Sequence, residues 1–445
     1  MPHLVALGSY IASRHDARVA IFDRDYERRI SGHGEESLLS GSWDVIGLSC
    51  YTSFDYAAVM AMAELIRSRC RGVCLAVGGY HPSACPEDFC GPESPFDHVV
   101  VGEGEIPLSR IVEGVQNGRS LDARVLGPEA LTSIDELPPL KWELLERYSA
   151  LFTDGCQLNL NLSRGCPFPC AFCMEPGKRS LRWRAYSPAR AVEEMQRLLA
   201  AFPRARGVLR ITDAVFGLDP GWRHDVLERL KGRPLPVNKT WAVTRSDLLD
   251  DSDISHFDGA GFAVGFGIES GDADMLRVMR KTSDPAKFLE RFAAQAQMAE
   301  VCGLPWGVNL IAGHPGETPE SLSRSAEWMR TLVASLRRPT GFLCVDPYRY
   351  YPGSAVHRDR LEYEGRFGTR ILVPDWWRRD NPTVDSMRVD ASRTLNFDQR
   401  ERLRRSLFAP VLEDLLRRFA YNGPEKRYFE GALLEEVQFA RESLS

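Results

Sequence analysis

The sequence predicts an α/β protein in which a doubly wound parallel sheet is followed by a partial (β/α)6 barrel and a mostly helical C-terminal region. Strand-like apolar runs alternate with helical patterns twice along the chain, first in residues 1–120 and again in residues 150–348. The intervening residues 121–149 are rich in proline, glycine and charge, which predicts an extended linker. Residues 349–445 form the C-terminal accessory region, with a predicted helix at 397–418.

The first series predicts a sheet with helices on both faces. Its expected elements are helices at 4–14, 55–69 and 106–117 and strands at 17–22, 44–50, 73–79 and 97–102. Glycine-rich turns at 78–79 and 102–105 follow the last two strands. Because doubly wound sheets bind ligands at the carboxyl ends of their strands, these turns predict a ligand site. Strand-end geometry is the alternative explanation, since glycine permits turns that are closed to other residues.

The second series contains six strand-like runs, which is fewer than a complete eight-stranded barrel needs. The strands are expected at 157–162, 208–212, 239–243, 262–268, 306–312 and 341–347, and the helices near 188–202, 220–231, 284–302 and 318–335. By analogy with complete barrels, we expect the active site at the C-terminal ends of these strands.

The segment after the first of these strands carries the strongest chemical signal. It reads Arg164-Gly-Cys166-Pro-Phe-Pro-Cys170-Ala-Phe-Cys173, so three thiols have the spacing Cys-x3-Cys-x2-Cys. Three thiolates can bind three irons of a [4Fe-4S] cluster and leave the fourth iron open to a small molecule. Three ordinary buried cysteines are the alternative. The remaining eight cysteines have no coherent ligand spacing and are interpreted as buried hydrophobes or free thiols.

This segment, including Phe172 before the third cysteine, resembles the cluster loop of the radical S-adenosylmethionine (SAM) enzymes. The resemblance implies that SAM chelates the open iron. It also implies that one electron from the cluster cleaves SAM into methionine and a 5′-deoxyadenosyl radical. A physiological electron donor such as flavodoxin or ferredoxin is then needed as a partner.

Later strand ends carry further elements that resemble this family, and they imply contacts to SAM. Asp213 would accept hydrogen bonds from the ammonium group of SAM, and Arg245 would pair with its carboxylate. A helix cap is the alternative for Asp213, and an ion pair with Asp247 or Asp250 is the alternative for Arg245.

The next two strand ends match the family more closely. Glu269 and Ser270, in a Gly-x-Glu-Ser element, would bind hydroxyl groups or the amino group of SAM. A buried glutamate at a strand end would otherwise be costly. Gly313 would let the backbone meet adenine, although the segment after it also reads as a plain turn and a helix start.

The first series and its glycine turns are similar to the B12-binding domain that precedes many radical SAM barrels. That domain normally opens with a central strand and a loop, whereas Met1 lies almost at the first helix, so we expect one central strand to be missing. The missing strand puts an intact cobalamin site in doubt. No Asp-x-His-x-x-Gly motif offers a lower cobalt ligand. His81 could be nominated, with packing or solvent exposure as the alternative.

The expected reaction follows from the doubt about cobalamin. The layout is similar to the radical SAM diol-dehydratases of aminoglycoside pathways such as that of apramycin. It implies a lyase that dehydrates an amino sugar in antibiotic biosynthesis, with a separate reductase downstream. A cobalamin-dependent C-methyltransferase is the alternative, and a non-catalytic iron–sulfur electron carrier is a remote one. The expected substrate residues are Glu175, Asp346, Tyr348 and Tyr350, each with an ordinary surface or packing role as the alternative.

Composition limits the partners. The 445 residues include 44% hydrophobic ones, enough for large cores, and the formal charge of -5 argues against a surface built for nucleic acid. The apolar residues 4–12 are too few to span a membrane, and no cleavable export signal precedes them. We therefore expect a cytoplasmic enzyme with a small polar substrate and no nucleic acid or membrane partner.

Overall fold

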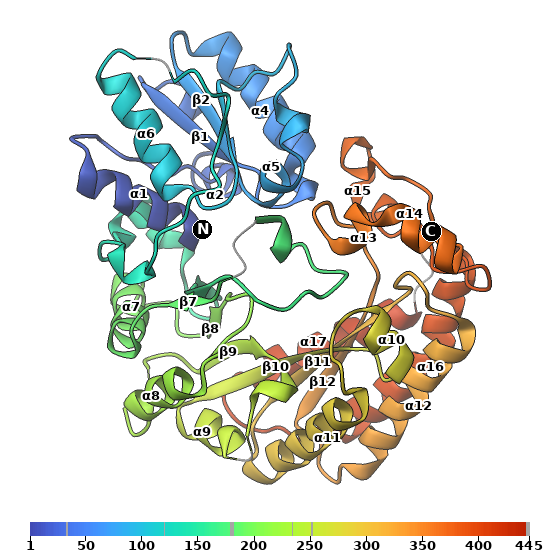
Figure 1. Cartoon of the computed structure of the whole chain (residues 1–445). Helices are drawn as coiled ribbons and strands as arrows, with labels where there is room; N and C mark the ends of the chain where they lie inside the picture. Colours follow the sequence, from blue (N-terminus) through green and yellow to red (C-terminus); the bar gives the residue numbers. More distant parts are fainter. Residues whose placement is uncertain (33, 120, 179–181, 234, 251, 442–445) are drawn as a thin grey trace.

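A computed structural model describes the chain except residues 33, 120, 179–181, 234, 251 and 442–445. The N-terminal sheet lies above the open mouth of the barrel, and the segment that follows the first barrel strand lies between them (Figure 1). Residues near 350–390 lie beside the N-terminal domain on the other side of the mouth. The predicted two-sheet α/β architecture is therefore confirmed.

The N-terminal sheet has four parallel strands in the order β1-β2-β3-β4. They are β1 (Val45–Ser49), β2 (Cys74–Gly78), β3 (His98–Val100) and β4 (Val125–Leu126). The helices of this domain are α1 (Pro2–Arg14), α2 (Arg24–Ser31), α3 (Glu36–Leu39), α4 (Tyr56–Arg69), α5 (Tyr80–Ala84) and α6 (Glu105–Gln116). Side chains alternate along β2, so that Leu75 and Val77 share a core with α4 while Ala76 packs with Ile111 of α6.

The predicted strand at 17–22 is wrong, because these residues belong to no sheet. β1 pairs with β2 alone, which leaves its other edge without a neighbouring strand among the described residues. Residues 16–22 and 42–49 line the same large cavity. A strand exists only when a partner supplies its hydrogen bonds. The fourth strand, β4, instead lies within the predicted linker.

All six predicted barrel strands are present, and they pair in parallel in chain order to form an open half barrel. They are β5 (Leu158–Leu160), β8 (Val208–Ile211), β9 (Lys239–Thr244), β10 (Phe262–Glu269), β11 (Trp306–Ala312) and β12 (Gly341–Pro347). The helices are α7 (Pro188–Ala201), α8 (Pro220–Leu230), α9 (Asp253–Gly259), α10 (Ala273–Val278), α11 (Pro285–Cys302) and α12 (Pro319–Ser335). A short antiparallel pair, β6 (Ser163–Arg164) and β7 (Arg184–Ala185), flanks the cysteine segment.

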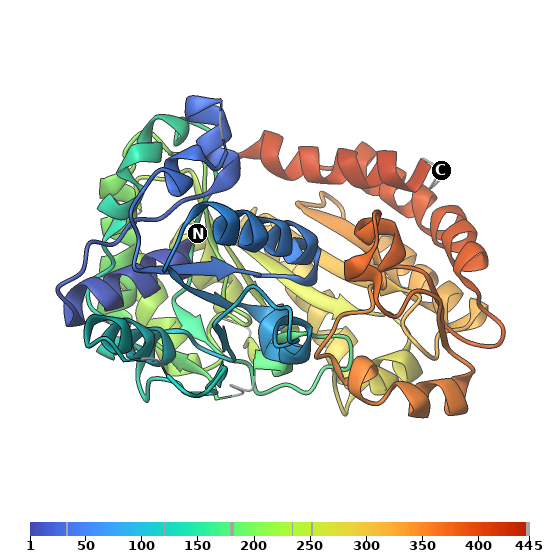
Figure 2. The same cartoon turned by 90° about the horizontal axis from the view of Figure 1, so that it is seen from above.

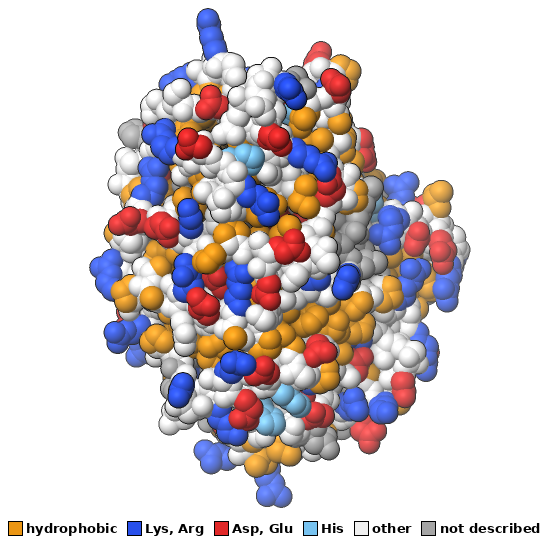
Figure 3. All heavy atoms as spheres, turned by 60° about the vertical axis from the view of Figure 1, so that its left-hand side comes forward, with side chains coloured by type: hydrophobic (Ala, Val, Ile, Leu, Met, Phe, Trp, Pro, Cys, Tyr) orange, Lys and Arg blue, Asp and Glu red, His pale blue; other side chains and the backbone are white. Residues whose placement is uncertain are grey.

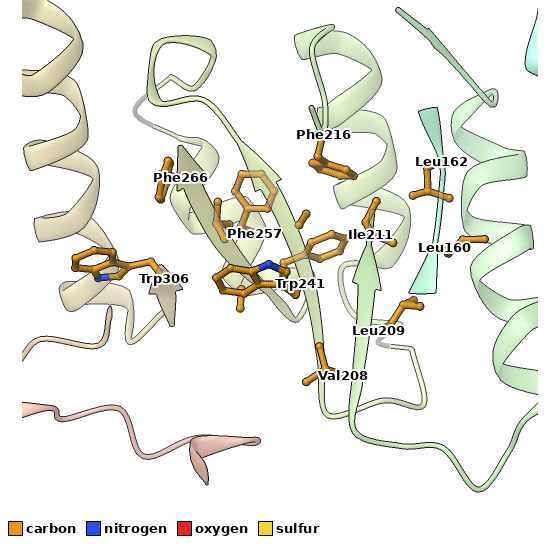
Figure 4. Close-up of a cluster of buried hydrophobic side chains, with 14 of the residues drawn as sticks. Leu160, Leu162, Val208, Leu209, Ile211, Phe216, Trp241, Phe257, Phe266 and Trp306 are labelled. Carbon is orange, nitrogen blue, oxygen red and sulfur yellow. The ribbon is translucent and has the colours of Figure 1, made fainter. Parts of the chain in front are cut away.

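The barrel core explains several small residues in the strands. A Cβ on Gly265 would lie 2.6 Å from the Trp241 ring, and one on Gly307 would lie 2.8 Å from the same ring. The two glycines therefore make room for the indole inside the barrel. Figure 4 shows part of the hydrophobic core, with Leu160 and Ile211 on neighbouring strands.

The C-terminal region contains the predicted helix at 397–418 and further helices that were not predicted. Its elements are α13 (Ala355–Arg358), α14 (Arg360–Phe367), β13 (Arg370–Ile371), α15 (Pro382–Asp385), β14 (Val389–Asp390), α16 (Phe397–Arg418) and α17 (Lys426–Arg441). Figure 2 shows α16 and α17 as long helices at the edge of the molecule. The 397–418 prediction is confirmed by α16.

Helix α17 joins the two ends of the half barrel. The Tyr428 hydroxyl donates to Gln157 Oε1 at 3.1 Å just before β5, while Val345 N of β12 donates to Glu436 Oε2 at 3.2 Å. The Phe429 ring lies within stacking range of Trp241 inside the barrel. The last helix therefore spans the open side of the barrel.

The C-terminal region also docks on the N-terminal domain. Trp376 is fully buried, its indole N–H donates to Tyr350 O at 2.6 Å, and its ring lies 4.7 Å from that of Phe54. Arg378 and Asp88 form an ion pair of 2.7 Å across the same interface. The mouth of the barrel is thus bordered by all three regions of the chain.

The surface shows no division by charge on the face drawn in Figure 3, where acidic and basic side chains are interspersed. Over the described residues, every helix is too short or too polar to cross a bilayer.

Candidate functional site

The cysteine segment is held between the barrel and the C-terminal region. Ala171 N donates to Met279 O at 2.8 Å, and Val356 N donates to Ala171 O at 3.2 Å. These backbone bonds fix the loop from two sides, because each joins it to an element distant in sequence. A preorganised loop of this kind suits a bound metal group.

The three cysteines are unpaired thiols with nearby donors. Cys170 is 8% exposed, and Arg245 Nη1 lies 3.8 Å from its Sγ. Glu175 N donates to Cys173 Sγ at 3.4 Å. Burial raises the pKa of the Cys173 thiol to about 12, so a thiolate here needs a neighbouring cation such as iron. Three soft donors at this spacing fit the predicted [4Fe-4S] cluster.

A buried ion-pair network ties the start of this segment to the N-terminal domain. Arg164, two residues before Cys166, donates to Glu103 at 3.1 Å and to Glu105 at 2.7 Å. Arg184 also bonds to Glu103 and donates to Leu131 O at 2.5 Å. The 102–105 turn therefore holds the cluster loop, because one partner of each pair comes from each domain.

A cavity of about 810 Å³ connects the two domains. It is lined by the carboxyl ends of β1 and β2, by the 102–105 turn, and by Arg164, Gly165 and Glu175 beside the cysteines. The turn after β2 requires glycine, because Gly79 has φ +125° and a Cβ there would overlap the Cys50 carbonyl oxygen. The sequence-predicted ligand edge and the cysteine loop thus share one cavity.

Tyr80 bridges this cavity and the cysteine loop. Its hydroxyl donates to Glu175 Oε2, and its ring lies edge-on to Tyr51 with centroids 5.3 Å apart. Both tyrosines and Glu175 line the cavity. Sequence reasoning missed Tyr80, although its place directly after the glycine turn could have drawn attention to it.

Asp213 lies at the end of β8, but its oxygens are already hydrogen-bonded. Leu162 N donates to Oδ1 at 2.7 Å and the Ser163 hydroxyl donates to Oδ2 at 2.6 Å, so the carboxylate holds the start of the cluster loop against β8. Burial raises the pKa of Asp213 to about 7. The helix-cap alternative is wrong, because Asp219 caps α8.

Arg245 lies beside the cluster loop and also forms the ion pair that was its alternative. Its guanidinium donates to Asp247 at 2.9 and 2.7 Å and to Lys281 O at 2.6 Å. The same group lies 3.8 Å from the centre of the Phe168 ring. The ion pair therefore aims a positive charge at the cysteine loop.

Glu269 and Ser270 lie at the carboxyl end of β10, as predicted. Glu269 is 7% exposed, adopts φ +71°, and accepts from Lys281 Nζ at 3.0 Å. A non-glycine residue at positive φ is strained, which is common at ligand sites. The Ser270 hydroxyl lies 2.8 Å from that of Ser325. The lysine partner explains how the buried carboxylate is tolerated.

The turn after β11 has an unexpected support from the C-terminal region. Gly313 has φ +89°, its N–H donates to Glu317, and a Cβ there would overlap Arg400 of α16. Glu317 and His314 are fully buried, and burial raises the pKa of Glu317 to about 8 and lowers that of His314 to about 4. Glycine is therefore required by packing as well as by turn geometry.

Two family models match the chain. Residues 160–329 match the radical SAM superfamily, and residues 23–112 match the B12 binding domain. The chain therefore contains a radical SAM domain preceded by a B12-binding domain. A [4Fe-4S] cluster and SAM are accordingly its cofactors, and Cys166, Cys170 and Cys173 have a spacing that suits such a cluster.

Known proteins resemble this radical SAM protein over most of its length. An uncharacterized methyltransferase of Pyrococcus horikoshii is 26% identical over 394 residues, covering 84% of this chain and 80% of that relative. The radical SAM methyltransferase TsrM from Kitasatospora setae, solved with cobalamin and a [4Fe-4S] cluster, gives a TM-score of 0.68 at 15% identity and covers 99% of this chain and 96% of its own. The cobalamin-dependent enzyme OxsB, solved with aqua-cobalamin and SAM, gives a TM-score of 0.69 at 16% identity. The match covers 99% of this chain and 69% of the OxsB chain.

These findings correct the expected reaction. The preference for a dehydratase-type lyase over a methyltransferase is wrong, because the relative that aligns over most of both chains is a methyltransferase. The preference rested on the expected lack of one strand, yet the B12-binding family model matches residues 23–112 and a cavity of about 810 Å³ lies at the ligand edge of this domain. The comparisons give no support to the expected role in antibiotic biosynthesis.

His81 is not placed to bind cobalt. It is 1% exposed, its Nδ1 lies 2.6 Å from Ser53 Oγ and its Nε2 lies 2.9 Å from Asp88 Oδ2. It is absent from the cavity lining. The packing alternative for this residue therefore describes it better.

The four expected substrate residues are not brought together. Glu175 alone among them lines the cavity. Tyr348 is 1% exposed beside His314, and its hydroxyl meets no hydrogen-bond partner among the described residues. Tyr350 is buried against His357, and Asp346 lies on the edge strand β12. The geometry thus singles out Glu175 and leaves the others as packing or edge residues around the site.

Proposed function

We propose that this protein is a cobalamin-dependent radical SAM C-methyltransferase that acts on a small-molecule substrate. The observation that carries the proposal is the single cavity that runs from the ligand edge of the B12-binding domain to the cluster loop. The methyltransferase relative that aligns over most of both chains supports it. When bound, cobalamin supplies the methyl group, and the cluster with SAM supplies the radical that activates the substrate carbon.

The residues present fit a bulky cofactor at the sheet edge. Gly79 and Gly102 have positive φ and lack side chains at the cavity wall, and Gly47 of β1 has no atom within 4 Å of a Cβ position. The cavity volume of about 810 Å³ is near the upper end of the range typical of ligand sites. We infer that these strand ends hold the corrin, while Asp213, Arg245, Glu269, Ser270 and Gly313 surround SAM.

The chain's own groups prepare the radical step. Arg245 places its charge near Cys170 and the inferred SAM carboxylate. The aromatic residues of the C-terminal region pack against the N-terminal domain beside the mouth of the barrel, which limits the access of water and competing hydrogen donors to the radical. We infer that Glu175, at the cavity wall, contacts the substrate or its solvent shell.

The proposal is tested with anaerobically reconstituted protein and hydroxocobalamin, without knowledge of the substrate. We expect one corrin per chain and, with SAM and a strong reductant, both 5′-deoxyadenosine and cobalamin-dependent S-adenosylhomocysteine. The Cys170→Ala variant should retain the corrin and lose 5′-deoxyadenosine. Absence of bound corrin, or S-adenosylhomocysteine formation that does not depend on cobalamin, would contradict the proposal.

A further inference from the structure

We propose that Tyr80 and Glu175 are positioning residues through which the N-terminal domain sets the reduction potential of the cluster. The core of this proposal needs only the radical SAM assignment, and its cobalamin-dependent part rests on the proposed function. Neither residue belongs to the cysteine motif. They are 95 positions apart and meet only because the B12-binding domain lies on the barrel mouth.

The contacts form a continuous path from the cavity to a cluster ligand. Tyr80 follows β2 at the ligand edge of the sheet, and its hydroxyl donates to Glu175 Oε2. The backbone N–H of Glu175 donates to Cys173 Sγ at 3.4 Å. Glu175 is 5% exposed, so both the carboxylate and the amide act where water screens them poorly. One residue therefore links a hydroxyl of the N-terminal domain to a sulfur of the cluster site.

The direction of the effect follows from electrostatics. Hydrogen bonds to cluster sulfurs and the net charge around a cluster set its reduction potential. A donor to Cys173 Sγ stabilises the reduced, more negative cluster and raises the potential, whereas the nearby carboxylate of Glu175 lowers it. The Tyr80 hydroxyl draws charge away from that carboxylate and keeps the Glu175 backbone in place. Loss of the hydroxyl should therefore make the cluster harder to reduce.

The same contact makes the cluster sensitive to what the cavity holds. Tyr80 and Tyr51 form an edge-on ring pair on the cavity wall. A cofactor bound at this wall would contact the Tyr80 ring and would change the geometry of its hydrogen bond to Glu175. Cofactor binding would therefore shift the reduction potential of the cluster.

The test is an anaerobic redox titration of the reconstituted full-length protein, followed by electron paramagnetic resonance. Tyr80→Phe removes the hydroxyl and keeps the ring. Tyr51→Phe is the matched control, because it makes the same change in the same cavity at a hydroxyl that is not hydrogen-bonded to Glu175. Glu175→Gln removes the charge. We expect a lower midpoint potential for Tyr80→Phe, a higher one for Glu175→Gln, and that of wild type for Tyr51→Phe, at equal iron content.

Addition of hydroxocobalamin provides the second comparison. We expect it to shift the midpoint of wild type and of Tyr51→Phe, and to shift that of Tyr80→Phe by less than half as much. The proposal would be overturned if wild type and Tyr80→Phe had equal midpoint potentials without cobalamin. It would also be overturned if hydroxocobalamin shifted the midpoint potentials of both tyrosine variants equally. If wild type binds no corrin, the proposed methyltransferase function fails, while the cobalamin-free potentials still decide the role of the Tyr80–Glu175 pair.

Discussion

Replacement of Glu317 by glutamine should remove a pH-dependent loss of stability. This carboxyl is fully buried beneath the Gly313 turn, with Arg400 and Asp272 as its charged neighbours, and burial raises its pKa from 4.5 to about 8. Between these values the folded protein keeps the proton that the unfolded chain releases. The contribution of Glu317 to stability is therefore fully present below pH 4.5 and is lost as the pH rises toward 8.

The size of the effect follows from the two pKa values. A pKa difference of one corresponds to about 1.4 kcal/mol, so the full window corresponds to roughly 5 kcal/mol. An unfolding entropy of about 2.1 cal/mol/K per residue converts this to roughly 5 °C in melting temperature for a chain of this length. Glutamine is neutral and can still accept the Gly313 N–H, so the variant should lack this slope.

The assay is the melting temperature of wild type and Glu317→Gln from pH 5 to pH 8.5, measured by scanning calorimetry. The melting temperature of the variant should increase relative to that of wild type as the pH rises, most steeply from pH 5 to 8. Glu327→Gln, which neutralises an exposed carboxylate on α12, the helix that follows Glu317, serves as the control and should follow wild type. A difference between Glu317→Gln and wild type that stays constant across this range would refute the reasoning.

Three further substitutions test the packing around the site. Gly79→Val should abolish corrin binding and leave the iron content of the cluster unchanged, because a side chain at φ +125° overlaps the Cys50 carbonyl. Corrin absorbance at the wild-type level would contradict this prediction. Trp376→Ala should cost roughly 3–5 kcal/mol of unfolding free energy by urea denaturation and speed proteolysis of residues 349–390, and unchanged cleavage would argue against its docking role. Asp253→Asn should lower the unfolding free energy by roughly 3–5 kcal/mol, because it leaves the Arg223 charge buried without its partner. The assay is again urea denaturation, and a loss below about 1 kcal/mol would contradict this prediction.

The barrel could be predicted because its signal is local. Each barrel strand is an apolar run with turn residues on either side, and all six were found within a few residues of their observed bounds. Residues 17–22 have the same pattern but form no strand, because strand formation also needs a neighbour. Helix α17 has an apolar stripe that was overlooked, since only the fold shows which surface it covers.

The sequence was enough to predict which strand ends carry the site residues, but not which side chains those residues contact. Asp213, Glu269 and Gly313 lie where the sequence placed them, whereas Lys281 and Arg400 approach from elements that no motif connects to them. The reaction was predicted wrongly because it was inferred from the expected lack of one strand, whereas the cavity that joins the two domains can be seen only in the fold.

The span of helix α17 across the barrel has a consequence for biogenesis. Its residues bond to Gln157, just before the first barrel strand, and to Val345 of the last one, so this side of the barrel stays uncovered until α17 has left the ribosome. During synthesis the cysteine loop therefore emerges long before its surroundings are complete. A truncation that removes α17, from Lys426 onward, should therefore yield a protein that takes up iron poorly.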